Sequence, residues 1–248
     1  MKICVVQTRP VKGDIQANIT NHKRLIDLAI SHDAGTIIFP ELSVTGYEPE
    51  LANELAMGAN DLRLDDFQEI SDNKSITIGV GVPTKNDRGI CISMIVFQPR
   101  KKRQIYSKKY LHEDELPFFV HGENTNALLG ETNVALAICY ELSVPQHAED
   151  AVKSGAGIYI ASAVKTKSGV EKSIQRLSEI ARNYSLIVLL SNCIGISGGY
   201  DCDGRTSAWN NKGVLLGQLG EKKEGILIMD TETEEIIQKT LQEEIHHI

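Results

Sequence analysis

Three residues with charged or reactive side chains stand where predicted strands end. Glu41 follows a short apolar run, Lys108 ends a more polar strand, and Cys139 ends another apolar run. Only the thiolate form of a cysteine attacks well, and a free thiol has a pKa of about 8.5, so the thiol needs a base such as a carboxylate. An ammonium can stabilise the oxyanion that forms during attack. If the strands lie side by side, the three side chains suit covalent cleavage of an amide.

Each of the three residues also has a structural explanation when it is taken alone. Cysteine is a small hydrophobe that is often buried without any chemistry, which could explain Cys139. Glu41 could face water or cap a helix. Lys108 lies in the basic run 101–109, and such runs are typical of solvated strand edges. Spacing alone leaves both explanations open.

The hydrophobic pattern predicts a chain in which strands and helices are mixed. Short apolar runs bounded by turn residues indicate strands, and apolar residues at helical spacing indicate helices with one polar face. We expect a single domain over residues 1–248, with helices outside the sheets and a polar arm at about 241–248. Strands are expected at 2–8, 35–40, 75–83, 90–99, 101–110, 133–140, 156–162 and 186–192, with two or three more in 204–230; helices at 14–30, 50–57, 64–72, 145–154 and 169–184; and a long loop at 111–125.

The composition argues against several classes of protein. A net charge of −7 disfavours a nucleic-acid binder, which would show a basic face. No stretch approaches the roughly 18 apolar residues that a membrane span needs, and the first apolar run is too short for a signal peptide. The 5 cysteines are an odd number without a Cys-x-x-Cys pair, which is typical of a reduced protein. We therefore expect a cytoplasmic protein with no nucleic-acid or membrane partner.

Three segments together resemble the signature motifs of the nitrilase, or carbon–nitrogen hydrolase, superfamily. Residues 39–47, 106–111 and 138–146 read FPELSVTGY, YSKKYL and ICYELSVPQ, in the family's order and at family-like separations. Residues 204–230 resemble the family's closing strands, so the resemblance covers nearly the whole chain. It implies an α/β fold, a four-layer α-β-β-α sandwich of the nitrilase type, that assembles as a homodimer or higher homo-oligomer.

The same resemblance implies a Glu-Lys-Cys triad acting through a thioester intermediate. Glu41 would be the general base, Lys108 the cationic oxyanion stabiliser and Cys139 the nucleophile. The backbone N–H of Tyr140 would be a second oxyanion donor. Such chemistry requires no metal and no organic cofactor.

The register at the lysine matters because two lysines are adjacent. Tyr106, Lys108, Tyr110 and Leu111 fit the family pattern. Strand alternation agrees, since Tyr106 and Lys108 share one face of a strand while Lys109 points to the other. We therefore predict that Lys108 is the catalytic lysine.

Many members of the family carry a second glutamate, followed by two aromatic residues and a glycine. Glu115, followed by Phe118, Phe119 and Gly122, matches this pattern. Glu113 competes for the same assignment but fits the spacing less well. An exposed loop acid is the structural alternative for Glu115.

Four residues are expected to line the substrate pocket on the same basis. Tyr47 ends the first motif, and Ser162, Ala163 and Val164 lie in a segment, 160–169, that resembles the family's loop after the strand that follows the nucleophile. Val164 stands where an aromatic residue is frequent, so this wall of the pocket is expected to be less suited to stacking.

Several positions depart from the commonest family pattern. Glu141 replaces an aspartate, Ser143 and Gln146 replace two charged residues, His121 replaces a proline and Tyr110 replaces a histidine. None of these changes removes the triad. The lost charges leave the substrate open among amides, N-carbamoyl compounds and nitriles. Acyl transfer to an amine also remains an alternative to hydrolysis.

A serine hydrolase is a competing hypothesis. The segment GISGG at 195–199 matches the G-x-S-x-G motif, and the order Ser197, Asp201, His246 fits that class. A nucleophile elbow needs an apolar helix after the serine, whereas residues 198–207 are predicted to form a loop. A non-catalytic family member that binds a metabolite is a third hypothesis, against which the intact triad argues.

The remaining polar clusters suggest no metal site. His112 to Asp114 and the pair His246–His247 lack a third or fourth ligand at a known spacing. The expected partners are a small-molecule amide and further copies of the chain. Apolar residues at 27–30 and 178–188 exceed what one inner helix face needs, and outward apolar patches normally mark interfaces.

Overall fold

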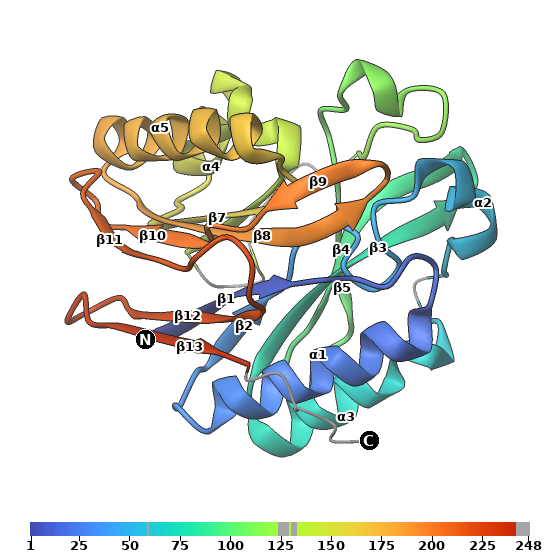
Figure 1. Cartoon of the computed structure of the whole chain (residues 1–248), viewed down its shortest axis with the longest axis horizontal. Helices are drawn as coiled ribbons and strands as arrows, with labels where there is room; N and C mark the ends of the chain where they lie inside the picture. The colour runs from blue at the N-terminus through green and yellow to red at the C-terminus, as the bar shows by residue number, and fades with distance from the viewer. Residues whose placement is uncertain (59, 124–128, 130–132, 242–248) are drawn as a thin grey trace.

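The chain folds into four layers, and it is described here from a computed structural model. In Figure 1 helices α4 (Pro145–Lys153) and α5 (Lys167–Tyr184) lie above one sheet, and helices α1 (Ile15–Ile30) and α3 (Asp65–Lys74) lie below a second sheet. The two sheets face one another across a shared apolar interior. This arrangement confirms the sandwich that the sequence predicts. The structure describes residues 1–58, 60–123, 129 and 133–241.

The first helical layer and its sheet come largely from the first half of the chain. The opening helix is capped by Asp14, whose side chain accepts a hydrogen bond from the N–H of Ala17, as is usual for an N-cap aspartate. The sheet has the order β13-β12-β1-β2-β3-β4-β5. Its elements are β1 (Lys2–Thr8), α1 (Ile15–Ile30), β2 (Thr36–Ile38), α3 (Asp65–Lys74), β3 (Thr77–Asn86), β4 (Gly89–Phe97), β5 (Gln104–Ser107), β12 (Gly225–Asp230) and β13 (Ile236–Thr240).

The second sheet and its helices come from the rest of the chain. The longer helix begins after Thr166, whose hydroxyl accepts a hydrogen bond from the N–H of Gly169. The sheet has the order β6-β7-β8-β10-β11, and β9 pairs with the far end of β8. The elements are β6 (Val134–Ile138), α4 (Pro145–Lys153), β7 (Ile158–Ala163), α5 (Lys167–Tyr184), β8 (Ile187–Ser197), β9 (Tyr200–Asp203), β10 (Ser207–Trp209) and β11 (Leu215–Gln218).

A short parallel pairing between β1 and β8 joins the two sheets and sets their common direction. Gln7 lies opposite Asn192, and Thr8 lies opposite Cys193. The strands β2 and β3 run parallel to β1, and β6 and β7 run parallel to β8. Two antiparallel steps make β5 parallel to β3. The carboxyl ends of β2, β5, β6 and β7 therefore lie at the same edge of the sandwich.

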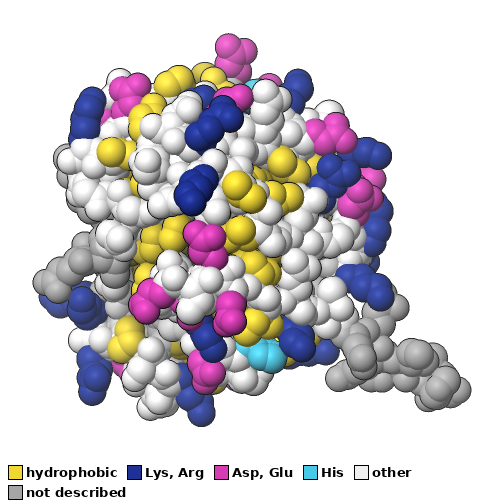
Figure 2. Space-filling view, turned by 90° about the vertical axis from the view of Figure 1, so that its left-hand side faces the viewer, with side chains coloured by type: hydrophobic (Ala, Val, Ile, Leu, Met, Phe, Trp, Pro, Cys, Tyr) yellow, Lys and Arg dark blue, Asp and Glu magenta, His cyan; other side chains and the backbone are white. Residues whose placement is uncertain are grey.

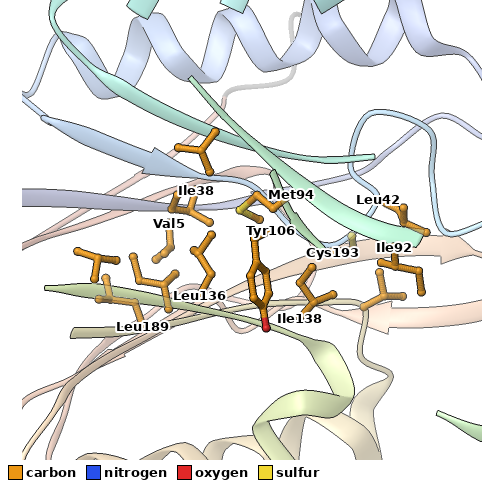
Figure 3. Close-up of a cluster of buried hydrophobic side chains, with 14 of the residues drawn as sticks. Val5, Ile38, Leu42, Ile92, Met94, Tyr106, Leu136, Ile138, Leu189 and Cys193 are labelled. Carbon is orange, nitrogen blue, oxygen red and sulfur yellow. The ribbon is translucent and has the colours of Figure 1, made fainter. Parts of the chain in front are cut away.

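The strands are buried on both faces because each sheet has the other sheet on one side and helices on the other. Val5 packs between the sheets, whereas its neighbour Val6 packs under α1 and α3. Leu136 likewise faces the space between the sheets, and Ala137 faces α4 and α5. Figure 3 shows part of this inner cluster. Burial on both faces explains why these strands read as continuous apolar runs.

Part of the segment 198–207, which was predicted as a loop, is instead the turn and second strand of a hairpin. β8 continues to Ser197, which lies opposite Tyr200 of β9. Gly198 and Gly199 connect them, both with positive φ, as a two-residue hairpin turn requires. A pair of glycines between two short strands is a recognisable hairpin signal, so this element could have been found from the sequence.

Other elements differ in extent from the expectation. The helix predicted at 50–57 is only a 3₁₀ turn and one α turn, because the N–H of Met57 donates to Pro83 O and the chain turns toward β3. The edge strand β13 was not expected, since its exposed half is polar. The short turns are η1 (Pro49–Leu51), α2 (Ala52–Leu55), η2 (Leu62–Leu64), η3 (Glu113–Glu115) and η4 (Cys139–Ser143).

The apolar residues that were expected to face outward from the helices are instead buried or partly buried. Leu28 and Ile30 pack against the core beneath α1 and α3, and Ile180 and Ala181 are buried beneath α5. The expected outward patch at 27–30 and 178–188 is therefore wrong. Within the described ranges, no helix has the length and hydrophobicity needed to cross a bilayer. Of the expected arm at 241–248, only Leu241 is among the described residues.

Candidate active site

The ends of β2, β5 and β6 bring the predicted triad together. Lys108 lies between two carboxylates, and its Nζ donates to Glu41 Oε1 at 2.8 Å and to Glu115 Oε1 at 2.6 Å. The side chains of Lys108 and Glu41 are fully buried. Glu115 is 2% exposed, whereas its competitor Glu113 is exposed. The structure therefore places Glu115, and not Glu113, in the cluster.

A glycine on the neighbouring strand positions the turn that carries Glu41. The carbonyl of Gly81 accepts a hydrogen bond from the N–H of Val44 at 3.1 Å. A Cβ atom on Gly81 would collide with the backbone between Pro40 and Leu42. The backbone of β3 can approach the turn so closely only because residue 81 has no side chain.

A second glycine holds the segment that carries Lys108. The N–H of Lys108 donates to Ile92 O at 2.8 Å, and the N–H of Gly122 donates to Lys108 O at 2.8 Å. A Cβ atom on Gly122 would collide with the backbone of Ser107. This close approach gives a structural reason for the glycine in the predicted Glu115–Gly122 pattern.

Cys139 lies at the point where β6 passes into η4. Its φ is +46°, a conformation that costs energy for any residue with a side chain and that clusters at functional sites. Its Sγ lies 3.7 Å from Val164 O at the end of β7. The N–H of Tyr140 belongs to the first turn of η4, where N–H groups have no partner inside the helix. That N–H is therefore suited to bind an oxyanion.

Glu141 joins the lysine segment to the cysteine segment. Its Oε1 accepts a hydrogen bond from the N–H of Lys109 at 2.6 Å. Its Oε2 accepts from the hydroxyl of Tyr106 and from the N–H of Ile138, both at 2.7 Å. The sequence indicated Glu141 only as a departure from the family pattern. Its position two residues after the nucleophile was the available signal, but these three donors come from two separate segments of the chain.

A buried histidine completes this support. His147 Nε2 lies 2.8 Å from the Tyr106 hydroxyl, and Nδ1 lies 2.8 Å from the Tyr159 hydroxyl. Because the Tyr106 proton is donated to Glu141, Nε2 carries the imidazole hydrogen and Nδ1 accepts from Tyr159. Burial lowers the pKa of His147 to about 4, with the Lys109 charge acting in the same direction. The imidazole is therefore neutral at neutral pH.

The charges in the cluster favour a neutral Cys139 thiol next to a Glu41 carboxylate that can accept its proton. Burial raises the pKa of Glu41, and the Glu115 charge adds to this, against the Lys108 ammonium. Burial also raises the pKa of the Cys139 thiol, and the Glu41 charge raises it further. Glu41 Oε2 is buried and has no hydrogen-bond partner of normal geometry in the described part of the chain. This oxygen is the acceptor available for the thiol proton.

Lys108 is a fixed cation. Burial by itself lowers the pKa of its ammonium, but the charges of Glu41, Cys139 and Glu115 outweigh that effect and raise the pKa above its ordinary value. A buried ammonium between two carboxylates keeps its proton at any physiological pH. It can therefore act electrostatically without taking part in proton transfer.

A cavity of about 270 Å³ lies over Cys139. Tyr47 and Val164 line it as predicted, but Ser162 and Ala163 do not. The Ser162 hydroxyl donates to Phe39 O at 2.8 Å, and Ala163 packs toward α4 and α5. The other lining residues are His112, Asp114, Glu115, Tyr140, Lys165, Thr166, Gly169 and Tyr200.

Tyr47 connects the cavity to the catalytic cluster. Its hydroxyl donates to Glu115 Oε1 at 3.1 Å. Its N–H donates to the hydroxyl of Ser197 at 2.8 Å. Ser197 is 1% exposed and supports this loop, while Asp201 is exposed and His246 lies outside the described residues. A strand-turn-strand at Ser197 is not a nucleophile elbow, so the structure does not support the serine hydrolase hypothesis.

The two polar clusters that were weighed as metal sites from the sequence are His112 to Asp114 and the pair His246–His247. His112 Nδ1 lies 3.4 Å from Asp114 Oδ2 at the mouth of the cavity. Among residues 1–58, 60–123, 129 and 133–241, no three or more His, Cys, Asp or Glu side chains are arranged to hold a metal ion. The pair His246–His247 lies outside that part of the chain.

Two known proteins are similar in sequence over almost the whole of this chain. The "Hydrolase in agr operon" of Staphylococcus aureus is 26% identical in an alignment 247 residues long, which covers 96% of this chain and 94% of that protein. The "Glutamine-dependent NAD(+) synthetase" of Thermotoga maritima is 23% identical in an alignment 256 residues long, which covers 97% of this chain but only 44% of that protein.

The fold matches solved structures of the amidase from Nesterenkonia sp. AN1. One of them shows the Michael addition of acrylamide at the active-site cysteine, and it has a TM-score of 0.84 at 21% identity, covering 93% of this chain and 92% of that chain. Another is a complex with butyramide, with a TM-score of 0.83 at 21% identity, covering 92% and 89%. These likenesses confirm the fold.

A model of the carbon–nitrogen hydrolase family matches residues 2–239, which is nearly the full chain. This match agrees with the four-layer fold and with the three motifs that meet at one edge of the sandwich. The chain belongs to the carbon–nitrogen hydrolase family and has the fold of the nitrilase superfamily.

Proposed function

We propose that the protein is an amidase-type hydrolase that cleaves the C–N bond of a small amide or carbamoyl compound through a thioester on Cys139. The observation that carries this proposal is the buried cluster of Glu41, Lys108 and Glu115 next to the cavity that Cys139 lines. A carboxylate with a free oxygen supplies the base, and a fixed ammonium supplies the oxyanion stabiliser.

The first half-reaction forms the thioester. Glu41 accepts the thiol proton as Sγ of Cys139 bonds to the substrate carbonyl carbon. The Lys108 ammonium and the N–H of Tyr140 stabilise the resulting oxyanion. The C–N bond breaks as the proton passes from Glu41 to the leaving nitrogen, so ammonia or an amine departs and the acyl group stays on sulfur.

The second half-reaction releases the acid. Glu41, again a carboxylate, accepts a proton from water as the water oxygen bonds to the thioester carbon. The same oxyanion donors act a second time. The C–S bond then breaks, the carboxylic acid departs, and the proton on Glu41 returns to the sulfur of Cys139. Glu115 keeps the Lys108 ammonium in place through both steps.

The proposal is tested by ammonia release from a panel of small amides, N-carbamoyl compounds and nitriles. Butyramide belongs in the panel because an amidase of the same fold binds it. Cys139→Ala should reduce the release to background, and Ser197→Ala, which removes only the support for Tyr47, should retain most of it. A Cys139→Ala protein that keeps its activity while Ser197→Ala loses it would move the function to the serine hydrolase hypothesis.

We also propose that the protein works in a reducing compartment, as a cytoplasmic enzyme does. None of its five cysteines forms a disulfide, and four of them are buried in the core. The chemistry requires the free thiol of Cys139. Persistence of activity in millimolar dithiothreitol, with loss on thiol oxidation, supports this assignment.

A further inference from the structure

The end of β7 presents a lysine to the candidate nucleophile. Sγ of Cys139 lies 3.7 Å from Val164 O, so the peptide that links Val164 to Lys165 contacts the thiol. Lys165 is partly buried and lines the same cavity as Cys139. This residue was not among the pocket residues expected from the sequence.

The backbone of Lys165 is held rigidly by a buried side chain. Asn192 is fully buried, and its Oδ1 accepts a hydrogen bond from the N–H of Lys165 at 2.9 Å. Its Nδ2 donates to Lys165 O at 3.4 Å and to Gly204 O at 2.7 Å. The N–H of Asp203 also donates to Lys165 O, at 3.1 Å. The lysine therefore projects from a fixed point beside the thiol.

The ammonium of Lys165 has no counter-charge in the described part of the chain. Other cations near the site are paired, since Lys108 contacts two carboxylates and Lys12 lies 3.0 Å from Glu48. Lys165 makes no such ion pair among the described residues. Its charge nevertheless acts on the site, because it opposes the burial and the Glu41 charge that raise the pKa of Cys139, and does so more strongly than Lys108.

Of the two acidic side chains that line the cavity, Glu115 is buried and engaged, whereas Asp114 is exposed. Glu115 accepts hydrogen bonds from Lys108 and Tyr47. Asp114 lies 3.4 Å from the ring of His112. A partly buried cation that has no ion-pair partner among the described residues, and that lines the same cavity as Cys139, is suited to bind an anionic group that enters with the substrate.

We propose that Lys165 is the specificity-determining residue of this site and that its ammonium binds a carboxylate of the substrate. The preferred substrates are then short amides that carry a carboxylate, such as the monoamides of small dicarboxylic acids. This inference rests on the proposed amidase function, and it narrows the substrate class of that function.

The test compares charged and neutral amides of equal length. Succinamate is paired with butyramide, and glutaramate with valeramide. Lys165→Met should lower kcat/KM for the two anionic amides by about 10- to 100-fold, the usual effect of losing a hydrogen bond to a charged group. The values for the two neutral amides should fall by a smaller factor, equal for both, because these substrates lose only the effect of the Lys165 charge on the thiol. Lys165→Arg keeps the charge and should retain the preference.

Lys167→Met is the matched control. Lys167 is exposed and does not line the cavity. Removing its charge changes the net charge of the protein by the same amount as Lys165→Met, so a long-range electrostatic effect would show in both variants. The preference for succinamate over butyramide should be unchanged in Lys167→Met.

Alkylation of Cys139 gives a second readout that needs no turnover. Iodoacetate and iodoacetamide react at the same carbon but differ in charge, and the other four cysteines are buried. Lys165→Met should lower the iodoacetate rate at Cys139 by about 10-fold relative to the iodoacetamide rate. An equal decrease with both reagents would mean that Lys165 acts only through the thiol and does not bind the anion, and this outcome would overturn the proposal.

The outcomes separate the inference from the proposed function. If the wild type hydrolyses butyramide and succinamate equally well, and Lys165→Met does too, the inference fails and the amidase function stands. If no amide is hydrolysed but Lys165→Met still loses the iodoacetate selectivity, anion binding stands and the amidase function fails. If neither the amide preference nor the alkylation ratio depends on Lys165, the inference is overturned.

Discussion

At the scale of single residues, the site depends on a buried ammonium shared by two carboxylates. Lys108 is fully buried between Glu41 and Glu115. A buried charge without partners would cost several kcal/mol, so the three groups stabilise one another in their charged forms. The arrangement leaves Oε2 of Glu41 free to accept a proton and keeps the Lys108 ammonium at a fixed position. Preorganisation of this kind lowers the barrier because no group has to be reoriented during the reaction.

Lys108→Met should lower kcat for a neutral amide by about 10²–10³ with little change in KM, since the oxyanion forms only after attack. Lys109→Met should be nearly silent, because the Lys109 side chain is 44% exposed and its Nζ lies 3.6 Å from Asp150. The measurement is steady-state kinetics of both variants with one active amide, with urea denaturation as a check on folding. A functional Lys108→Met next to an inactive Lys109→Met would show that the strand register is wrong.

The pH dependence of activity should report the base. Glu41 must be ionised to accept the thiol proton, and burial raises its pKa above the ordinary value of 4.5. Activity is therefore lost as pH falls through this raised pKa, so the acid limb of kcat/KM should lie above pH 4.5. Because Glu41 and Cys139 interact, the apparent pKa of this acid limb belongs to the two groups together and not to Glu41 alone. Glu41→Gln should abolish activity, and an acid limb at or below pH 4.5 would contradict the assignment.

At the scale of elements, close backbone packing fixes where the catalytic residues lie. Gly81 of β3 supports the turn of Glu41, and Gly122 supports the segment of Lys108. Glu141 then joins the Lys108 segment to the end of β6. Each catalytic side chain thus extends from a strand end that is held by a neighbouring element, which is more precise than a free loop.

Gly81→Ala and Gly79→Ala form a matched pair on β3. The new methyl group of Gly81→Ala meets the backbone of Leu42 and must displace the Glu41 turn, so kcat should fall by about 10². The methyl group of Gly79→Ala meets only the ends of the Ile38 and Met94 side chains, at 2.7 and 2.9 Å, which can rotate. It should cost stability of about 1–3 kcal/mol and little activity. Similar kcat values in both variants, measured with folded protein, would contradict the supporting role of Gly81.

At the scale of the whole molecule, none of the exposed large apolar side chains among the described residues lies on an α-helix. They include Val214 and Leu215 at the start of β11, which forms an edge of its sheet, and Ile196 and Tyr200 of the β8–β9 hairpin. Figure 2 shows the left-hand side of the molecule as drawn in Figure 1. Hydrophobic side chains on that side lie among charged ones. Exposed apolar groups of this kind, rather than the helix faces, are the candidates for contacts between copies.

We propose that the chain forms a homodimer or a higher homo-oligomer. Light scattering at micromolar concentration should give at least twice the chain mass of 27.3 kDa. Leu215→Lys, which places a charge on the exposed edge, should lower that mass if the edge lies in the interface, because an unpaired charge in an apolar contact is costly. A measured mass equal to that of a single chain at every concentration would contradict the proposal.

Much of this protein could be predicted from local pattern. Apolar runs, turn residues and helix spacing located most elements, because periodicity depends on neighbours within a few residues. Three motifs identified the family, and with it Glu41, Lys108 and Cys139. The family pattern and strand alternation together distinguished Lys108 from Lys109, and the structure places the first inside and the second outside.

Only the tertiary structure decided which of these residues meet and what surrounds them. Lys108 contacts Glu41, which is 67 residues away along the chain, and Glu141 joins segments about 30 residues apart. The tertiary structure also decided that Ser162 and Ala163 lie outside the cavity and that Lys165 lines it. Such contacts depend on the order and register of strands in two sheets. That order is set by burial summed over the whole chain, so no local pattern contains it.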